Sequence, residues 1–134
     1  MKSILVNKKF IAKTLKTRPK KGRLQDTMKL YKFYLPKHFN NGKKVPKEHF
    51  SSIARGIEKR FGAYSLYPEI HLPLIQGFWK SPTGERFKEP MYLLELFTED
   101  TFSNKEWISA FKIMIKQQLQ QEEIFILEQN AEVI

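Results

Sequence analysis

The sequence contains no cysteine, so it can form neither a disulfide nor a thiolate metal site. Long apolar runs are missing as well. The first eight residues hold three consecutive apolar positions, which is too few for a secretory leader, and no stretch approaches the length of a membrane-spanning helix. Internal repeats and long low-complexity runs are also absent from the sequence. These features together favour a cytoplasmic protein, and a membrane role is the less expected one.

Acidic residues are scarce in the first third of the chain, so the net positive charge of the protein is concentrated at its N-terminal end. Residues 1–48 hold 15 lysines and arginines against two acids, whereas residues 49–134 hold nine against 12. The formal net charge of +10 is therefore a property of the N-terminal third. Because a dense cationic segment attracts polyanions at long range, this asymmetry is a clue to a partner.

Length and composition indicate one folded domain with a tail. With 134 residues, of which 41% are hydrophobic and 13% aromatic, the chain can bury a sizeable core. Residues 1–27 contain the basic run TRPKKGR, which proline and glycine interrupt, and we assign them as a basic N-terminal extension. Residues 28–130 are assigned to the domain.

Apolar spacing predicts six elements in this domain. Strands are expected over 30–35, 70–79, 87–98 and 124–127, and helices over 46–60 and 104–120. A turn at 81–84 joins the two middle strands, and a capping box from Ser103 to Glu106 opens the second helix. Right-handed crossovers convert this order into a ferredoxin-like βαββαβ sandwich of the α+β class. Its second strand lies at an edge, which agrees with Pro73, a residue that cannot donate to a sheet.

The basic extension offers eight cations to the phosphates of a nucleic acid: Lys8, Lys9, Lys13, Lys16, Arg18, Lys20, Lys21 and Arg23. Aromatic residues interleaved with lysines follow over 29–39, although alternate aromatics in a half-buried strand are usually core. The leading interpretation is a small non-catalytic binding module that contacts nucleic acid non-specifically. An arm that aids solubility, or a narrow amphipathic helix on an anionic membrane, are alternatives for the same segment.

A small-molecule enzyme or ligand-binding protein is the alternative from a different class. Its pocket residues are Glu69, His71, Trp79 and Glu89, around the predicted hairpin. A histidine near carboxylates can act as an acid–base group, whereas the same residues at a sheet edge are often merely solvated. Because paired histidine spacing and phosphate-binding glycine loops are missing, we predict neither a metal site nor a cofactor.

A short pattern runs through the middle of the chain. It consists of Phe-Gly-Ala-Tyr at 61–64, Gly-Phe-Trp at 77–79, Gly84 and Glu89, with Gln-Glu at 121–122. The pattern resembles a loose group of uncharacterised bacterial ferredoxin-like proteins, in which a second glycine stands at the position of Ala63. The resemblance covers about residues 29–128. It implies the ferredoxin-like fold and a homodimer packed through the open sheet face, but no activity.

Overall fold

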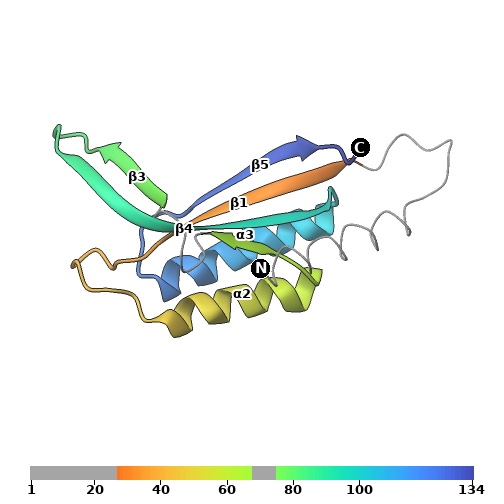
Figure 1. The fold of residues 1–134 in the computed structure, drawn as a ribbon, viewed down its shortest axis with the longest axis horizontal. Helices are drawn as coiled ribbons and strands as arrows, with labels where there is room; N and C mark the ends of the chain where they lie inside the picture. Colours follow the sequence, from red (N-terminus) through yellow and green to blue (C-terminus); the bar gives the residue numbers. More distant parts are fainter. Residues whose placement is uncertain (1–26, 68–74) are drawn as a thin grey trace, which may run out of the picture.

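The computed structural model describes residues 27–67 and 75–134. This part of the chain forms two layers, an antiparallel sheet and two helices that lie side by side on one of its faces (Figure 1). The expected α+β class is thus confirmed at the level of one antiparallel sheet with two helices. The basic extension up to residue 26, and the pocket candidates Glu69 and His71, lie outside the described residues.

One long strand organises the sheet. The strands are β1 (Met28–Pro36), β2 (Ser65–Tyr67), β3 (Ile75–Lys80), β4 (Arg86–Glu99) and β5 (Phe125–Ala131), and the helices are α2 (Lys47–Phe61) and α3 (Phe102–Gln118). The strand order is β2-β4-β1-β5, and β3 also pairs with β4. The second half of β4 pairs with β1 and β2, whereas its first half pairs with β3.

The predicted elements agree with the structure in position, with two differences. The short strand β2 precedes the middle strand expected over 70–79, which is described as β3 from Ile75 to Lys80, since residues 70–74 lie outside the described residues. The last strand continues to Ala131 instead of ending at 127, because β1 offers pairing partners as far as Met28. The turn at 81–84 is present, with Gly84 at a φ of 92°, a left-handed conformation that suits glycine.

The cap of α3 differs from the predicted capping box. Thr101 is the capping residue, because its extended backbone places the side-chain oxygen 3.1 Å from the amide of Asn104. The Ser103 hydroxyl instead accepts a hydrogen bond from Arg60 at the end of α2. The helix therefore starts two residues earlier than the sequence predicts.

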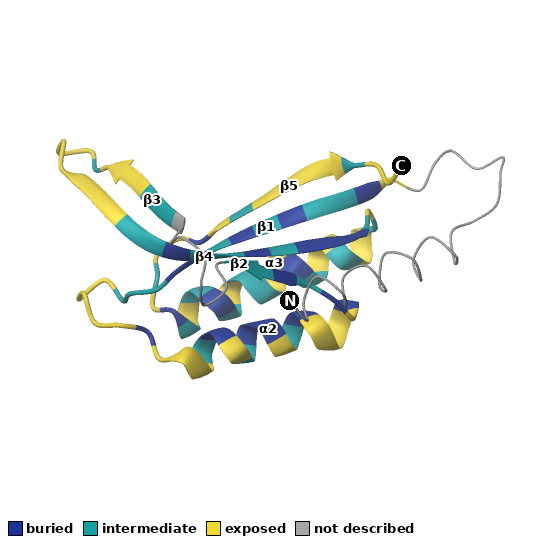
Figure 2. Cartoon of the chain, in the orientation of Figure 1, coloured by how far each residue is buried: buried dark blue, intermediate teal, exposed yellow. Residues whose placement is uncertain are grey.

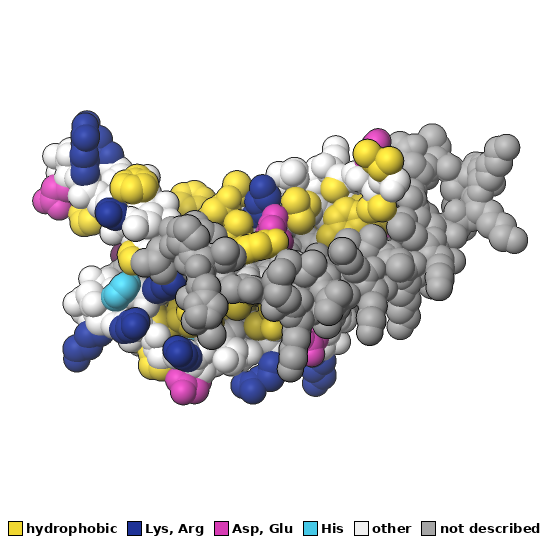
Figure 3. Space-filling model, in the orientation of Figure 1, with side chains coloured by type: hydrophobic (Ala, Val, Ile, Leu, Met, Phe, Trp, Pro, Cys, Tyr) yellow, Lys and Arg dark blue, Asp and Glu magenta, His cyan; other side chains and the backbone are white. Residues whose placement is uncertain are grey.

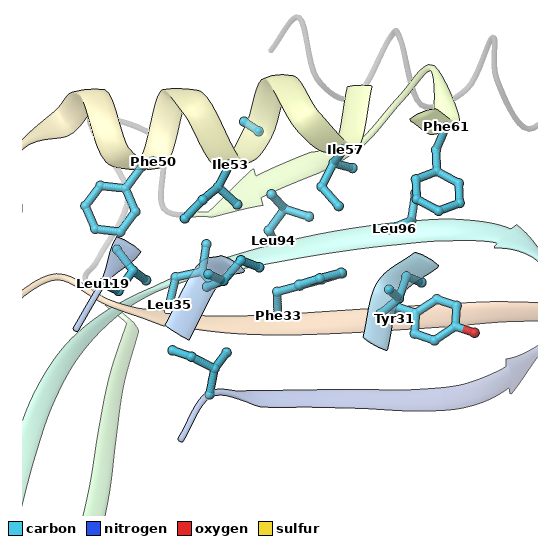
Figure 4. Close-up of a cluster of buried hydrophobic side chains, with 14 of the residues drawn as sticks. Tyr31, Phe33, Leu35, Phe50, Ile53, Ile57, Phe61, Leu94, Leu96 and Leu119 are labelled. Carbon is cyan, nitrogen blue, oxygen red and sulfur yellow. The ribbon is translucent and has the colours of Figure 1, made fainter. Parts of the chain in front are cut away.

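The core lies between the helices and one face of the sheet (Figures 2 and 4). Alternate residues of β1 and β4 point into it, while α2 and α3 each contribute the apolar side of the helix. The fully buried members include Phe33, Leu35, Leu94, Leu96, Ile53, Ile57, Ile115 and Leu119. The aromatics of β1 divide accordingly: Phe33 is core, whereas its neighbour Tyr34 is half-buried on the opposite face.

The two helices are in tight contact at Gly56. A Cβ atom at this position would lie 2.8 Å from two ring carbons of Phe111 on α3. Glycine is therefore required by the contact between the helices and not by the backbone of α2.

We expect Gly56→Ala to lower the free energy of unfolding by about 1 kcal/mol, because overpacking a filled contact costs roughly 1–3 kcal/mol and alanine regains only about 1 kcal/mol of helix propensity. Urea denaturation followed by circular dichroism measures the change. Ser51→Ala on the exposed side of the same helix is the control and should be neutral or slightly stabilising. The double variant G56A/F111L should regain stability over G56A. A single variant as stable as the wild type would contradict the tight contact.

Candidate functional site

The sheet face opposite the helices is hollowed into a groove of about 820 Å³. The hairpin formed by β3 and β4 curves away from the helix layer on one side, and β5 does so on the other (Figure 1). Hydrophobic side chains gather in the hollow between them (Figure 3). Because this face has no covering layer among the described residues, its apolar side chains stay accessible.

Aromatic side chains form much of the groove. Trp79 on β3 and Phe87 on β4 are directly opposite each other, and their rings stack with centroids 4.3 Å apart. Trp79 keeps 51% of its surface exposed, and Phe125 on β5 keeps 66%. Tyr34 and Met91 also line the groove from the two central strands. A patch of large exposed apolar side chains of this kind marks a binding surface in many proteins.

Gly77 leaves room for the side chain of Met91. A Cβ atom at Gly77 would lie 2.8 Å from the Met91 sulfur, so the thioether occupies the space that a larger residue would fill. Gly77 also stands directly opposite Glu89 in the β3–β4 pairing. Close packing against Met91 thus explains the glycine at this position.

Glu89 is the ionisable group whose environment is most altered on this face. Burial raises the pKa of its carboxyl, while the nearby His38 and a hydrogen bond from the Trp79 side chain act in the opposite direction. The indole N–H of Trp79 is the donor in this interaction, and the two side chains lie on the same face of the hairpin. A partly desolvated carboxylate can bind a cation or accept a proton.

Two loops line the side of the groove opposite the β3–β4 hairpin. The Gln121 side-chain amide donates to the backbone oxygen of His38, and the Asn40 amide donates to that of Gln120, which ties the loop before α2 to the loop before β5. Glu123 is engaged by Lys112 at 2.9 Å. Its neighbour Glu122 forms no ion pair with any residue that the structure describes. Because Lys112 compensates Glu123, the lining carboxylates left are Glu89 and Glu122, and Lys80 is the lining cation, so the groove has a small excess of negative charge.

The structure brings together half of the pocket predicted from the sequence. Trp79 and Glu89 both line the groove, whereas Glu69 and His71 fall in the segment that is not described. The histidine that influences Glu89 is His38, which sequence reasoning did not select. Phe125, Tyr34 and Glu122 were missed too. The sequence did mark the aromatics over 29–39, Gln-Glu at 121–122 and the apolar run of the last strand, but none of these patterns indicated which side chains lie on the open face of the sheet.

The eight cations predicted to bind nucleic acid, from Lys8 to Arg23, lie outside the described residues. Within residues 27–67 and 75–134 there is no group of three metal-binding side chains. None of the described helices is long and apolar enough to cross a membrane.

No family model and no curated protein matches the chain. Among solved structures, the chain is similar to a phage SAM lyase in complex with S-methyl-5'-thioadenosine. The TM-score is 0.56 at 14% sequence identity, and the match covers 83% of this chain and 87% of the lyase. The two proteins thus share a fold, although few of their residues are identical.

This likeness overturns the leading interpretation of the sequence, a non-catalytic module that contacts nucleic acid. The shared fold is that of an enzyme with a small molecule bound. The described residues also present an aromatic groove with an excess of negative charge. Such a groove repels the phosphate backbone of a nucleic acid, and it lies outside the basic extension on which the nucleic-acid interpretation rested. The alternative interpretation, a small-molecule pocket near Trp79, is the one that these findings favour.

Replacing Glu89 by glutamine tests the burial of its carboxyl. The folded-state pKa lies above the unfolded-state value, so ionisation favours the unfolded chain and the native state loses stability as the pH rises between the two values. Glutamine does not ionise, so the E89Q variant does not lose stability in this way as the pH rises. We expect E89Q to have a slightly higher melting temperature than the wild type at about pH 7, and no advantage at about pH 3, where the glutamate is protonated.

Glu85→Gln, in the exposed turn of the same hairpin, is the matched control and should show a smaller difference between the two pH values. An E89Q variant that melts below the wild type at neutral pH but not in acid would mean that the ionised carboxylate stabilises the fold.

Proposed function

We propose that the groove binds S-adenosylmethionine (SAM) or a related adenosyl thioether, and that the protein is an enzyme that cleaves SAM. The observation that carries this proposal is the groove itself: exposed aromatic rings beside carboxylates, on the open face of a sheet whose fold is shared with a SAM lyase. The volume of about 820 Å³ lies within the range of pockets that take ligands of this size.

The two chemical parts of SAM correspond to the two kinds of side chain in the groove. The adenine ring can stack on Trp79 or Phe125, and stacking of a base on an aromatic residue contributes roughly 1–3 kcal/mol. The sulfonium is a cation, which suits the negative carboxylates of Glu89 and Glu122 and the faces of the aromatic rings. A neutral thioether lacks this second attraction. The carboxylates should therefore hold SAM more tightly than S-methyl-5'-thioadenosine and favour release of the neutral product.

Cleavage of the sulfonium requires few chemical groups from the protein. The bond from sulfur to the γ-carbon of the amino-acid chain breaks with both electrons going to sulfur, while an oxygen of the substrate's own carboxylate forms a new bond to that carbon. The products are a neutral thioether and a five-membered lactone, and no proton has to be transferred. The protein then has to bind the substrate in the conformation that brings the carboxylate to the γ-carbon, and to exclude water from it. In this proposal Glu89 holds the sulfonium and Trp79 holds the adenine beside it.

We also propose that the fold is a variant of the ferredoxin-like βαββαβ sandwich, preceded by the basic extension, in a cytoplasmic protein. The strand order supports this if β2 and β3 together take the place of one strand, since both pair with β4.

The homodimer implied by the resemblance remains a prediction. Sedimentation velocity would test it.

Trp79→Ala should weaken binding of S-methyl-5'-thioadenosine about tenfold or more, because it removes the main stacking surface of the groove. Isothermal titration calorimetry measures the dissociation constant. Phe102→Ala is the matched control, since Phe102 is equally aromatic and 77% exposed but stands at the start of α3, away from the groove. Equal affinity of the W79A variant and the wild type would exclude this site.

Incubation of the full chain with SAM should release S-methyl-5'-thioadenosine, which reversed-phase chromatography separates and quantifies. Trp79→Ala should slow the release about tenfold or more, whereas Phe102→Ala should leave it unchanged. SAM that stays intact at the rate of a protein-free control would contradict the enzymatic part of the proposal. Binding without turnover would leave the protein as a SAM-binding protein.

A further inference from the structure

A second cavity, of about 330 Å³, lies at the beginning of α2. Three lysines line it, Lys37, Lys44 and Lys47, together with the apolar and aromatic surfaces of Val45, Pro46, Phe50 and Tyr92. We call it the lysine pocket. Because side chains alternate along β4, Tyr92 points to the helix side of the sheet while Met91 points to the groove, so the two cavities lie on opposite faces.

The three lysines lack counterions in the part of the chain that the structure describes. The ion pairs there involve Lys29, Lys105 and Lys112 and none of the pocket lysines. The Lys37 ammonium instead lies 4.2 Å from the centre of the Tyr92 ring. Burial and the neighbouring Lys44 both lower the pKa of Lys37. Like charges held together without a partner create a site that an anion would stabilise.

The backbone holds these lysines in place. The Lys37 amide donates to the oxygen of Pro90 at 3.0 Å, and the Val45 amide donates to the oxygen of Lys37 at 2.8 Å. A bridge pairs His38 with Lys44, and a tight turn at Gly42 closes the small hairpin between them. Lys47 follows at once as the first residue of α2. The three lysines that line the pocket therefore stand on a hydrogen-bonded backbone, and basic side chains gather at this end of the molecule (Figure 3).

We propose that the lysine pocket binds a phosphate group. A phosphate carries about two negative charges near neutral pH and accepts several hydrogen bonds, so it matches three ammonium donors better than a carboxylate does. The pocket is large enough for inorganic phosphate or a small phosphomonoester. The start of α2, which has no side-chain cap, adds a favourable dipole at the same place. This site is independent of the groove and of the SAM proposal.

Titration of the full chain with inorganic phosphate, followed by ¹H–¹⁵N nuclear magnetic resonance at constant ionic strength, tests the proposal. We expect saturable shifts of the amides around 37–50, and a loss of affinity of about tenfold or more in the double variant K44A/K47A. Both replaced lysines are exposed, so the variant should keep the wild-type fold, which its spectrum reports directly. Lys59→Ala, an exposed lysine in the last turn of α2, is the control and should bind as the wild type does.

A parallel titration with glycerol 3-phosphate distinguishes the source of the phosphate. Tighter binding of the ester indicates a phosphomonoester ligand, and equal or weaker binding indicates free phosphate. Shifts that do not saturate, that sodium chloride reproduces, or that K59A weakens as much as K44A/K47A would overturn the proposal. None of these outcomes depends on whether the groove binds SAM.

Discussion

The pairing of β1 with β4 is the interaction on which the rest of the structure depends. Nine residue pairs fix a single register, in which Phe33 and Leu94 face the helices while Tyr34 and Leu93 face away. A slip of one residue would exchange these faces and expose the core, so burial under α2 and α3 selects the register strongly. The same register decides which side chains reach the open face.

The groove exists because β4 is longer than the core requires. Beyond Met91 it continues to Arg86 with β3 as its partner, and there the hairpin leaves the helix layer. Trp79 and Phe87 have no core to enter at this distance, and they stack on each other. Glu89 lies between this stack and the core, which accounts for its partial burial and raised pKa. One extension of one strand therefore supplies both the aromatic surface and the carboxylate of the proposed SAM site.

Local patterns in the sequence predicted those features whose causes are local. The apolar spacing of α2, the turn that ends at Gly84 and the placement of Trp79 and Glu89 in one hairpin belong to this group. Phe125 and Glu122 could not be placed, because their approach to the hairpin follows from pairing between strands far apart in the chain. The strong charge bias of residues 1–48 led to a nucleic-acid interpretation, although most of that charge precedes the domain that carries the groove.

Binding of an adenosyl thioether in the groove is the central claim, and a ¹H–¹⁵N titration with S-methyl-5'-thioadenosine tests it most directly. The account predicts saturable shifts of the Trp79 indole N–H and of the amides over 77–80 and 121–125, with the amides in the middle of α2 unchanged. A Trp79 indole signal that stays in place while the ligand saturates another surface, or no saturable shift at all, would contradict it.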